Sequence, residues 1–160
     1  MFVEVGGIEQ WLEIEGDGEK PVLLLEHGGP GASTRLANGG WMPWQKHFML
    51  VHWDQRGAGR TYQRNGPENC HPMTFAQGIA DGLGIAEFVH PHLKTENLFV
   101  LGHSWGSVVA AHMLKRCPHL FLTFTETGML VNFKDNEDLN YAKLPRLRHA
   151  HRIPGSRIEE

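Results

Sequence analysis

The chain has 160 residues, the length of a single domain that buries about two-thirds of its unfolded surface. Its 15 basic and 18 acidic residues give a formal charge of −3, and 41% of the residues are hydrophobic, a composition that favours a globular protein without nucleic-acid partners. Because no apolar run approaches the roughly 20 residues that a bilayer requires, and the N-terminus lacks a secretory signal pattern, we expect a cytoplasmic protein without a membrane contact.

The first half of the chain predicts strands that end in glycine-rich turns. Partial alternation around the glycine pair at residues 6–7 predicts a β-hairpin over residues 2–14. Two continuous apolar runs, residues 21–25 and 48–53, are typical of strands that are covered on both faces. A turn with several glycines follows each of these two runs.

The second half predicts helices that alternate with strands. Thr74 and Gln77 resemble a capping box ahead of a helix over residues 75–89, and the His90-Pro91 step is expected to end or kink this helix. The remaining predicted elements are a strand, a helix and a strand at residues 98–101, 107–116 and 120–124. This alternation predicts an α/β fold in which helices cover both faces of a mostly parallel sheet.

The most informative residue is Ser104, at the centre of the sequence Gly-His-Ser-Trp-Gly (residues 102–106) between a predicted strand and a predicted helix. This is the layout of a nucleophile elbow, a tight turn that exposes the serine hydroxyl. The turn strains the serine backbone and brings the residues two before and two after close together, which explains the glycines at 102 and 106. The pattern predicts acyl transfer with Ser104 as the catalytic nucleophile.

Attack by Ser104 on a carbonyl carbon creates an oxyanion, which needs hydrogen-bond donors already in place. The backbone N–H groups of Gly29 and Trp105 are the expected donors, because one follows the nucleophile and the other lies in a glycine loop that a substrate can approach closely. The neighbouring His27 and Gly28 are expected to contact the substrate. Loss of one such donor costs on the order of 3 kcal/mol of transition-state stabilisation.

Three polar residues near these motifs are interpreted as structural. Asp54 and Arg56 follow the second apolar run, and we expect them to hold their turn through side-chain hydrogen bonds. His103 directly precedes the nucleophile on a sharp turn, so its side chain is expected to point away from Ser104 and to pack beneath the elbow.

No metal or cofactor is expected. The pairs His90-Pro91-His92 and His149-Ala150-His151 have no third ligand at a suitable spacing, and the two cysteines, Cys70 and Cys117, form no metal or redox motif and are expected to be free thiols. The glycines at 57–59 lack the third glycine of a dinucleotide-binding fingerprint, and no Lys-Ser or Lys-Thr pair completes a phosphate-binding loop.

Three linked motifs, at residues 27–31, 54–61 and 102–107, resemble in order and spacing those of the proline iminopeptidase (prolyl aminopeptidase) family of α/β-hydrolases. The resemblance covers about residues 22–142. It implies an α/β-hydrolase fold and a serine aminopeptidase that releases an N-terminal residue, proline above all, from a small peptide, with related amides and esters as further substrates.

The resemblance also implies that this chain holds the N-terminal portion of the fold and that the later strands are missing. Residues 1–130 are expected to form a partial hydrolase core, and residues 131–160 the start of a helical cap followed from Pro145 by an irregular basic tail. In the family, the triad aspartate and histidine follow later strands, and acidic residues of the cap recognise the substrate amine. We expect these groups to lie outside this chain.

An internal substitute for the missing acid and base is the weaker alternative. Glu126, Asp135 or Asp138 follows the last predicted strand, and His149 or His151 lies further along the chain. No predicted strand fixes either histidine over the serine, and proximity without rigid placement contributes little to rate.

Three functions therefore stay open for the chain. The first is a serine hydrolase of the proline iminopeptidase type, or an esterase or amidase of the same fold, that is incomplete in this chain. The second is a truncated, inactive product whose final strand is an exposed sheet edge prone to self-association. The third is a non-catalytic binding module that uses the cleft at Gly29 and Trp105, since a fold does not fix a function.

Overall fold

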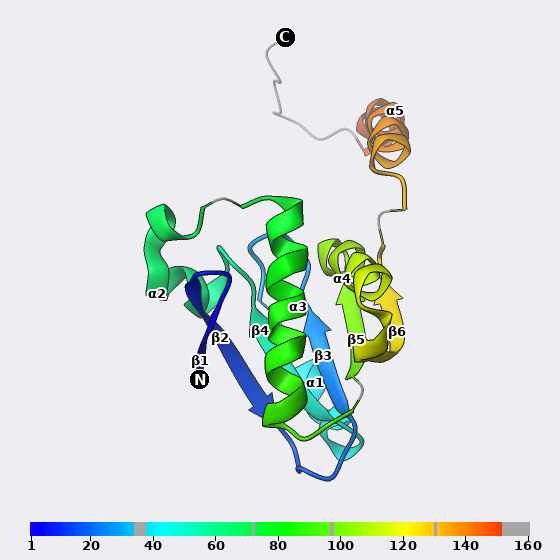
Figure 1. Cartoon of the computed structure of the whole chain (residues 1–160). Helices are drawn as coiled ribbons and strands as arrows, with labels where there is room; N and C mark the ends of the chain where they lie inside the picture. Colours follow the sequence, from blue (N-terminus) through cyan, green and yellow to red (C-terminus); the bar gives the residue numbers. More distant parts are fainter. Residues whose placement is uncertain (34–37, 72, 97, 130, 152–160) are drawn as a thin grey trace. The chain divides into compact units, whose positions relative to one another are not determined.

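The computed structural model describes residues 1–33, 38–71, 73–96, 98–129 and 131–151. The chain divides into two compact units, Met1–Met129 and Leu130–Glu160. The first unit is a sheet with helices, and the described part of the second unit contains the single long helix α5 (Phe133–His151) (Figure 1).

Six strands form one sheet in the order β1-β2-β4-β3-β5-β6. Their bounds are β1 (Phe2–Val5), β2 (Ile8–Glu15), β3 (Val22–Glu26), β4 (Met49–Asp54), β5 (Leu98–His103) and β6 (Phe121–Thr127). The first hairpin and the β2–β4 pair are antiparallel, whereas β3 pairs in parallel with β4 and β5, and β5 pairs in parallel with β6. The predicted mostly parallel sheet is confirmed, and each predicted strand lies within three residues of its observed bounds.

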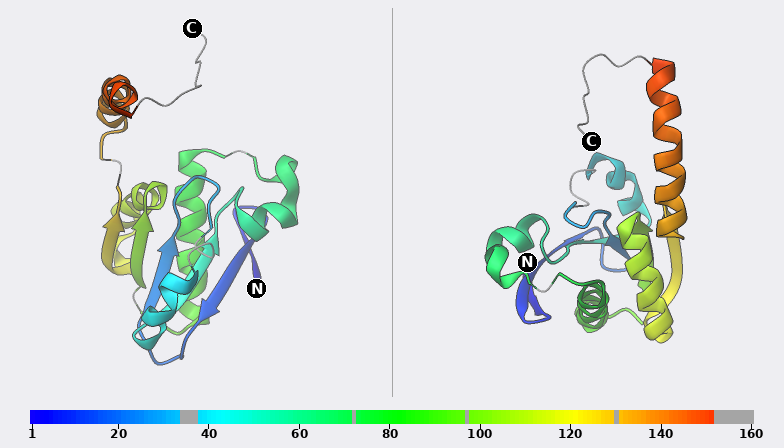
Figure 2. Two further views of the ribbon diagram at one scale, coloured as in Figure 1. Left: turned by 180° about the vertical axis from the view of Figure 1, so that it is seen from behind. Right: turned by 90° about the horizontal axis from the view of Figure 1, so that it is seen from above.

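Helices cover both faces of the sheet, as predicted (Figures 1 and 2). On one face, α3 (Phe75–His92) and α4 (Trp105–Arg116) enclose the larger core, which includes Leu12, Leu24, Val51, Val100, Ile85 and Met113. On the other face, the short α1 (Asn38–Trp41) and the 3-10 helix η2 (Met42–Lys46) adjoin a smaller core of Leu23, Leu25, Leu50 and Leu101. The strands of the sheet centre are therefore buried on both sides, which explains their continuous apolar runs.

Two helices continue through prolines: α3 through Pro91, where the sequence predicts an end or a kink, and α5 through Pro145, where it predicts an irregular segment. Helix α3 runs to His92 and contains Pro91, and α5 runs to His151 and contains Pro145, so the prediction of an irregular segment from Pro145 is wrong as far as residue 151. A proline inside a helix deprives the carbonyl four residues earlier of its hydrogen-bond partner, and its ring crowds that carbonyl. Those carbonyls belong to Glu87 and Tyr141, which are exposed, and water is available to them. Residues 152–160 of the predicted tail lie outside the described residues.

Helix α2 (Gly59–Asn69) is absent from the sequence prediction because glycine and proline interrupt its pattern. It is kinked at Gly66, where φ is 73° and ψ is 171°, just ahead of Pro67. The Asp54 side chain stabilises the start of this helix by accepting a hydrogen bond from the backbone N–H of Arg60 (2.8 Å). A further 3-10 turn, η3 (Pro118–Leu120), joins α4 to β6.

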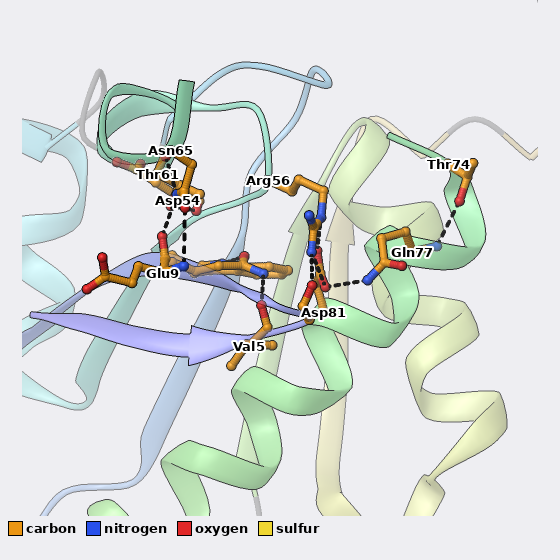
Figure 3. A network of polar contacts seen from close by, with 12 residues as sticks. Val5, Glu9, Asp54, Arg56, Thr61, Asn65, Thr74, Gln77 and Asp81 are labelled. Atoms are coloured by element: carbon orange, nitrogen blue, oxygen red, sulfur yellow. Dashed lines mark hydrogen bonds and ion pairs between the residues drawn. The ribbon is translucent and has the colours of Figure 1, made fainter. Parts of the chain in front are cut away.

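A buried ion pair links the turn after β4 to helix α3 and to the N-terminal hairpin (Figure 3). Arg56 Nε and Nη2 donate to the two carboxylate oxygens of Asp81 at 2.7 and 3.2 Å, and Nη2 also donates to the Gly6 carbonyl at 2.7 Å. Gln77 Nε2 donates to Asp81 as well, and the predicted cap is present, since the Thr74 hydroxyl accepts from the Gln77 N–H. The prediction that Asp54 and Arg56 hold their turn through hydrogen bonds is confirmed.

We expect the substitution Asp81→Asn to lower the free energy of unfolding by about 3–5 kcal/mol, because it leaves a buried guanidinium without its counter-ion. The Arg56 side chain is 6% exposed and that of Asp81 is fully buried. Urea denaturation measures the loss. The matched control is Asp17→Asn, whose partner Lys20 lies at the surface, and which should change the free energy of unfolding little. Equal effects of the two substitutions would contradict the structural role of the Arg56–Asp81 pair.

Candidate active site

Ser104 lies in the tight turn between β5 and α4, with φ 51° and ψ −118°. Among the described non-glycine residues, only Lys94 shares a positive φ. Such a conformation costs free energy and persists only where the surrounding structure enforces it. The backbone N–H of Ser104 donates to the Thr127 carbonyl at the end of β6 (2.9 Å), and the Ser107 N–H donates to the Ser104 carbonyl (3.0 Å). The turn is thus the strained strand-to-helix elbow that the sequence predicts.

The two glycines of the elbow stand where the main chain leaves no room for a side chain. A Cβ atom at Gly102 would lie 2.5 Å from the Ser107 Cα and 2.9 Å from the Gly106 carbonyl oxygen. A Cβ atom at Gly106 would lie 2.1 Å from the carbonyl oxygen of Glu26. The predicted crowding between the two glycines is confirmed at Gly102, whereas at Gly106 the limiting neighbour is strand β3.

The glycine loop after β3 lies directly against the elbow. A Cβ atom at Gly28 would be 3.2 Å from the Cβ of Ser104, and Gly29 has a φ of 128°, which favours glycine. The parallel pairing of β3 with β5 places the ends of both strands, and therefore the loop and the serine, at one edge of the sheet. That the N–H groups of Gly29 and Trp105 receive the oxyanion stays a prediction.

Both ring nitrogens of His27 lie within hydrogen-bond distance of main-chain groups. The residue is buried, and its Nε2 accepts a hydrogen bond from the Gln55 N–H at 3.0 Å, so Nδ1 carries the proton and faces the Gly28 carbonyl at 2.7 Å. Burial lowers the pKa of His27 and keeps the ring neutral. His27 therefore joins the glycine loop to the turn after β4. The expected contact of His27 and Gly28 with the substrate stays a prediction.

His103 does not pack beneath the elbow, and that prediction is wrong. The residue is exposed, and its ring lies beside Gly28 and Gly128, where added Cβ atoms would be 3.1 and 3.9 Å from ring carbons. The reason is its place at the end of the strand: His103 is the last residue of β5 and, unlike the buried Val100, Leu101 and Gly102 before it, is exposed.

Within the first unit, the structure places no acidic or histidine side chain in hydrogen-bond contact with Ser104 among the residues that it describes. The serine hydroxyl has no hydrogen-bond partner there. The candidate acids have local partners: Glu126 accepts from the Met129 N–H, Asp135 is bonded to Asn132, and Asp138 pairs with Lys134. The side chains of His149 and His151 lie outside the described residues.

Neither a metal centre nor a bilayer-spanning helix is found in the described ranges. No three histidine, cysteine or acidic side chains of these residues are grouped as metal ligands, and their helices lack the length and apolar character that crossing a bilayer needs. Cys70 and Cys117 are free thiols, as predicted.

Glu26 is a buried acidic residue that the sequence analysis did not single out. It is the last residue of β3, beneath the elbow, and its Oε2 accepts from Gln55 Nε2 at 3.3 Å, while Oε1 has no partner. Burial raises its pKa to about 8, so the carboxyl group is protonated at neutral pH. The sequence could have indicated Glu26, because it is an acidic residue at the end of an otherwise apolar run.

We expect the stability of the protein to fall as the pH rises from about 4.5 to 8, and the substitution Glu26→Gln to remove this part of the pH dependence. In the unfolded chain the carboxyl group ionises above its ordinary pKa of 4.5, whereas the folded one keeps its proton up to about pH 8. The unfolded state therefore binds fewer protons over this range, which costs up to about 3 kcal/mol by pH 7. Urea denaturation at pH 5 to 8 measures the effect.

The control for this experiment is Glu19→Gln, which neutralises an exposed carboxylate. The advantage of Glu26→Gln over the unsubstituted protein should grow with pH, whereas Glu19→Gln should follow the unsubstituted profile. Parallel profiles for all three proteins would show that Glu26 is ionised in the folded state.

Comparison with known proteins agrees with this geometry. The family model described as serine aminopeptidase, S33, matches residues 18–136. The "probable aminopeptidase YbaC" of Bacillus subtilis is 35% identical over 141 residues, which are 87% of this chain and 44% of that protein. A proline iminopeptidase of Arabidopsis thaliana is 33% identical over 90 residues, 56% of this chain and 21% of that protein.

Solved structures show the same fold. The crystal structure of a proline iminopeptidase-related protein from Thermus thermophilus superposes with a TM-score of 0.70 at 32% identity, over 83% of this chain and 45% of that one. An epoxide hydrolase from Vigna radiata, at 23% identity and a TM-score of 0.65, shares the fold over 79% of this chain and 38% of its own. The chain thus spans less than half the length of these relatives. With its strained serine elbow, its glycine loop and a family match over most of its length, the chain belongs to the serine aminopeptidase family S33 of α/β-hydrolases.

Proposed function

We propose that the protein is a serine hydrolase that releases an N-terminal residue, with proline preferred, from peptides through an acyl-enzyme on Ser104. The observation that carries the proposal is the positive φ of Ser104 in an elbow whose two glycines tolerate no side chain. The relatives named proline iminopeptidase support the choice of proline.

The proposed reaction has two steps. The Ser104 Oγ attacks the carbonyl carbon of the first residue while a base takes its proton, and the oxyanion receives hydrogen bonds from the N–H groups of Gly29 and Trp105. Collapse of this intermediate expels the rest of the peptide as an amine, which takes the proton from the base. Water then attacks the ester, releases the amino acid and restores the serine.

The base and its acid are proposed to come from parts of the protein beyond these 160 residues. The chain covers 44% of the Bacillus subtilis relative, and the described residues offer no partner to the Ser104 hydroxyl. A serine without a neighbouring base is a weak nucleophile. We accordingly propose that this chain supplies the nucleophile and the oxyanion site, and that the remaining part supplies proton transfer.

Strand β6 supports a second proposal, self-association of the isolated chain. It is the last strand of the sheet, and apart from Phe121 and Phe124 its residues are exposed, including Leu122 at 61%. An open strand edge with exposed apolar residues pairs readily with another chain.

In the protein that includes the parts proposed to supply the base and the acid, the substitution Ser104→Ala is expected to abolish both covalent labelling by a fluorophosphonate and the release of aminomethylcoumarin from its prolyl amide, with at least about a 10³-fold loss in kcat/KM. The matched control is Ser107→Ala, which removes a nearby buried hydroxyl and should keep both activities. Labelling by mass spectrometry and hydrolysis by fluorescence are measured on the same preparations.

Each other outcome points to a different function. Labelling of Ser104 with hydrolysis of esters or other amides but not of the prolyl amide would contradict the proline preference and favour an esterase or amidase. A folded monomer that takes no label would contradict the hydrolase and favour a binding module. A protein that takes no label and self-associates would favour a truncated and inactive product.

A further inference from the structure

Glu26 lies between the two main-chain segments that are proposed to receive the oxyanion. It is the last residue of β3, and the glycine loop follows it directly. A Cβ atom at Gly106 would lie 2.1 Å from the Glu26 carbonyl oxygen and 2.6 Å from that of His27, so the end of β3 touches the start of α4 here. The two predicted donors, Gly29 and Trp105, follow or precede this contact closely in the chain.

One side-chain amide connects the carboxyl group of Glu26 to the glycine loop. Gln55 Nε2 donates to Glu26 Oε2 at 3.3 Å and to the His27 carbonyl at 3.1 Å. A carboxylate accepts hydrogen bonds that are roughly twice as strong as those of a neutral acid. Ionisation of Glu26 would therefore draw the Gln55 amide toward the carboxylate and away from the loop.

The surroundings of the carboxyl group favour its neutral form. Glu26 is 1% exposed, its Oε1 has no hydrogen-bond partner, and among the described residues Gln55 provides the hydrogen bond to Oε2. A carboxylate that is removed from water needs several donors or a cation to offset the loss of hydration. One long hydrogen bond does not meet this need, so the buried group keeps its proton.

The titratable side chains on the elements around Glu26 do not supply a positive charge to it. They belong to His27, Asp54, Arg56, Asp81 and His103. Arg56 and Asp81 form an ion pair with each other (Figure 3), and Asp54 accepts from the Arg60 N–H. The His27 ring is neutral, and His103 is exposed.

Two further elements adjoin the end of β3 without adding a charge. The first turn of α4 contributes Gly106 and Ser107, which do not titrate in this range. His52 of β4 alternates with Val51 and Trp53, which belong to the larger core on the side of Leu24, and so lies on the opposite face of the sheet from Glu26. Within the described residues, an ionised Glu26 would thus be a buried charge without a counter-ion.

We infer that Glu26 is a positioning residue for the oxyanion site, which holds the glycine loop through Gln55 in its protonated form and loosens it on ionisation. Ionisation also adds a buried negative charge beneath the elbow, which opposes the negative charge that develops on the substrate oxygen. The reactivity of Ser104 therefore falls when Glu26 loses its proton. The effect on the reaction rests on the proposed function, whereas the effect on the loop does not depend on catalysis.

The first test is the pH dependence of fluorophosphonate labelling in the protein that includes the parts proposed to supply the base and the acid. The probe carries no amine or carboxyl group, so its own charge stays constant. Because burial raises the pKa of Glu26 to about 8, the second-order rate constant of labelling should fall about tenfold between pH 7 and pH 9. In Glu26→Gln, whose amide does not ionise, the two rate constants should agree within about twofold.

The matched control is Glu19→Gln, which neutralises an exposed carboxylate and should keep the alkaline fall. Ser104→Ala gives the background of labelling at other residues. Far-UV circular dichroism at both pH values checks that every variant is folded, so that a fall in rate is not a loss of structure.

The second test follows the 160-residue chain by NMR and requires no reaction. The carboxyl carbon of Glu26 should titrate with a midpoint near pH 8, and the backbone N–H groups of Gly29 and Trp105 should shift with the same midpoint. In Glu26→Gln neither N–H group should shift at that pH. The N–H of Gly18, in the exposed turn before β3, serves as the internal control and should not follow the titration.

The two tests separate this inference from the proposed function. Labelling of Ser104 without an alkaline fall, or with the same fall in Glu26→Gln, would overturn the inference and leave the hydrolase standing. A Glu26 carboxyl group that ionises near its ordinary pKa of 4.5, or N–H groups of Gly29 and Trp105 that do not follow its titration, would overturn it as well. If no label is taken at any pH, the hydrolase is contradicted, and shifts of both N–H groups with Glu26 would still support the positioning role.

Discussion

The site depends on a single steric constraint, the lack of space between the end of β3, the end of β5 and the start of α4. With 2.1 Å between a Cβ at Gly106 and the Glu26 carbonyl oxygen, and 2.5 Å between a Cβ at Gly102 and the Ser107 Cα, only glycines allow the three segments to meet. This contact holds Ser104 in its strained conformation and presents its hydroxyl at the sheet edge. The position of that hydroxyl is therefore a consequence of main-chain packing.

Polar side chains, rather than apolar ones, tie together the loops around this contact. Gln55, in the turn after β4, donates its backbone N–H to His27 Nε2 and its side-chain amide to the His27 carbonyl and to the protonated Glu26. Arg56 with Asp81 joins the same turn to α3. Buried polar groups are costly unless they are satisfied, but their directional bonds fix loops that have little apolar surface to bury. Stability and the geometry of the site are thus linked through the same residues.

In the proposed reaction, this chain supplies one half of an acyl-transfer site. The parallel strands β3 and β5 bring Ser104 and the glycine loop to one edge of the sheet, whereas the described residues of the first unit provide no hydrogen-bond partner for the Ser104 hydroxyl. The open strand β6, whose last carbonyl already receives the Ser104 N–H, lies next to the elbow.

The sequence by itself determined the strands, most of the helices and the position of the serine elbow, because apolar runs, a capping box and a Gly-x-Ser-x-Gly turn are local signals. It did not reveal helix α2, the continuation of α3 and α5 through Pro91 and Pro145, or the exposure of His103. These features depend on which backbone carbonyls and which faces of the elements are accessible to water in the folded protein. Only the tertiary structure assigned His27 to the glycine loop and placed Gln55 between that loop and Glu26. Both arise from residues that lie far apart in the chain and meet only when the strands pair.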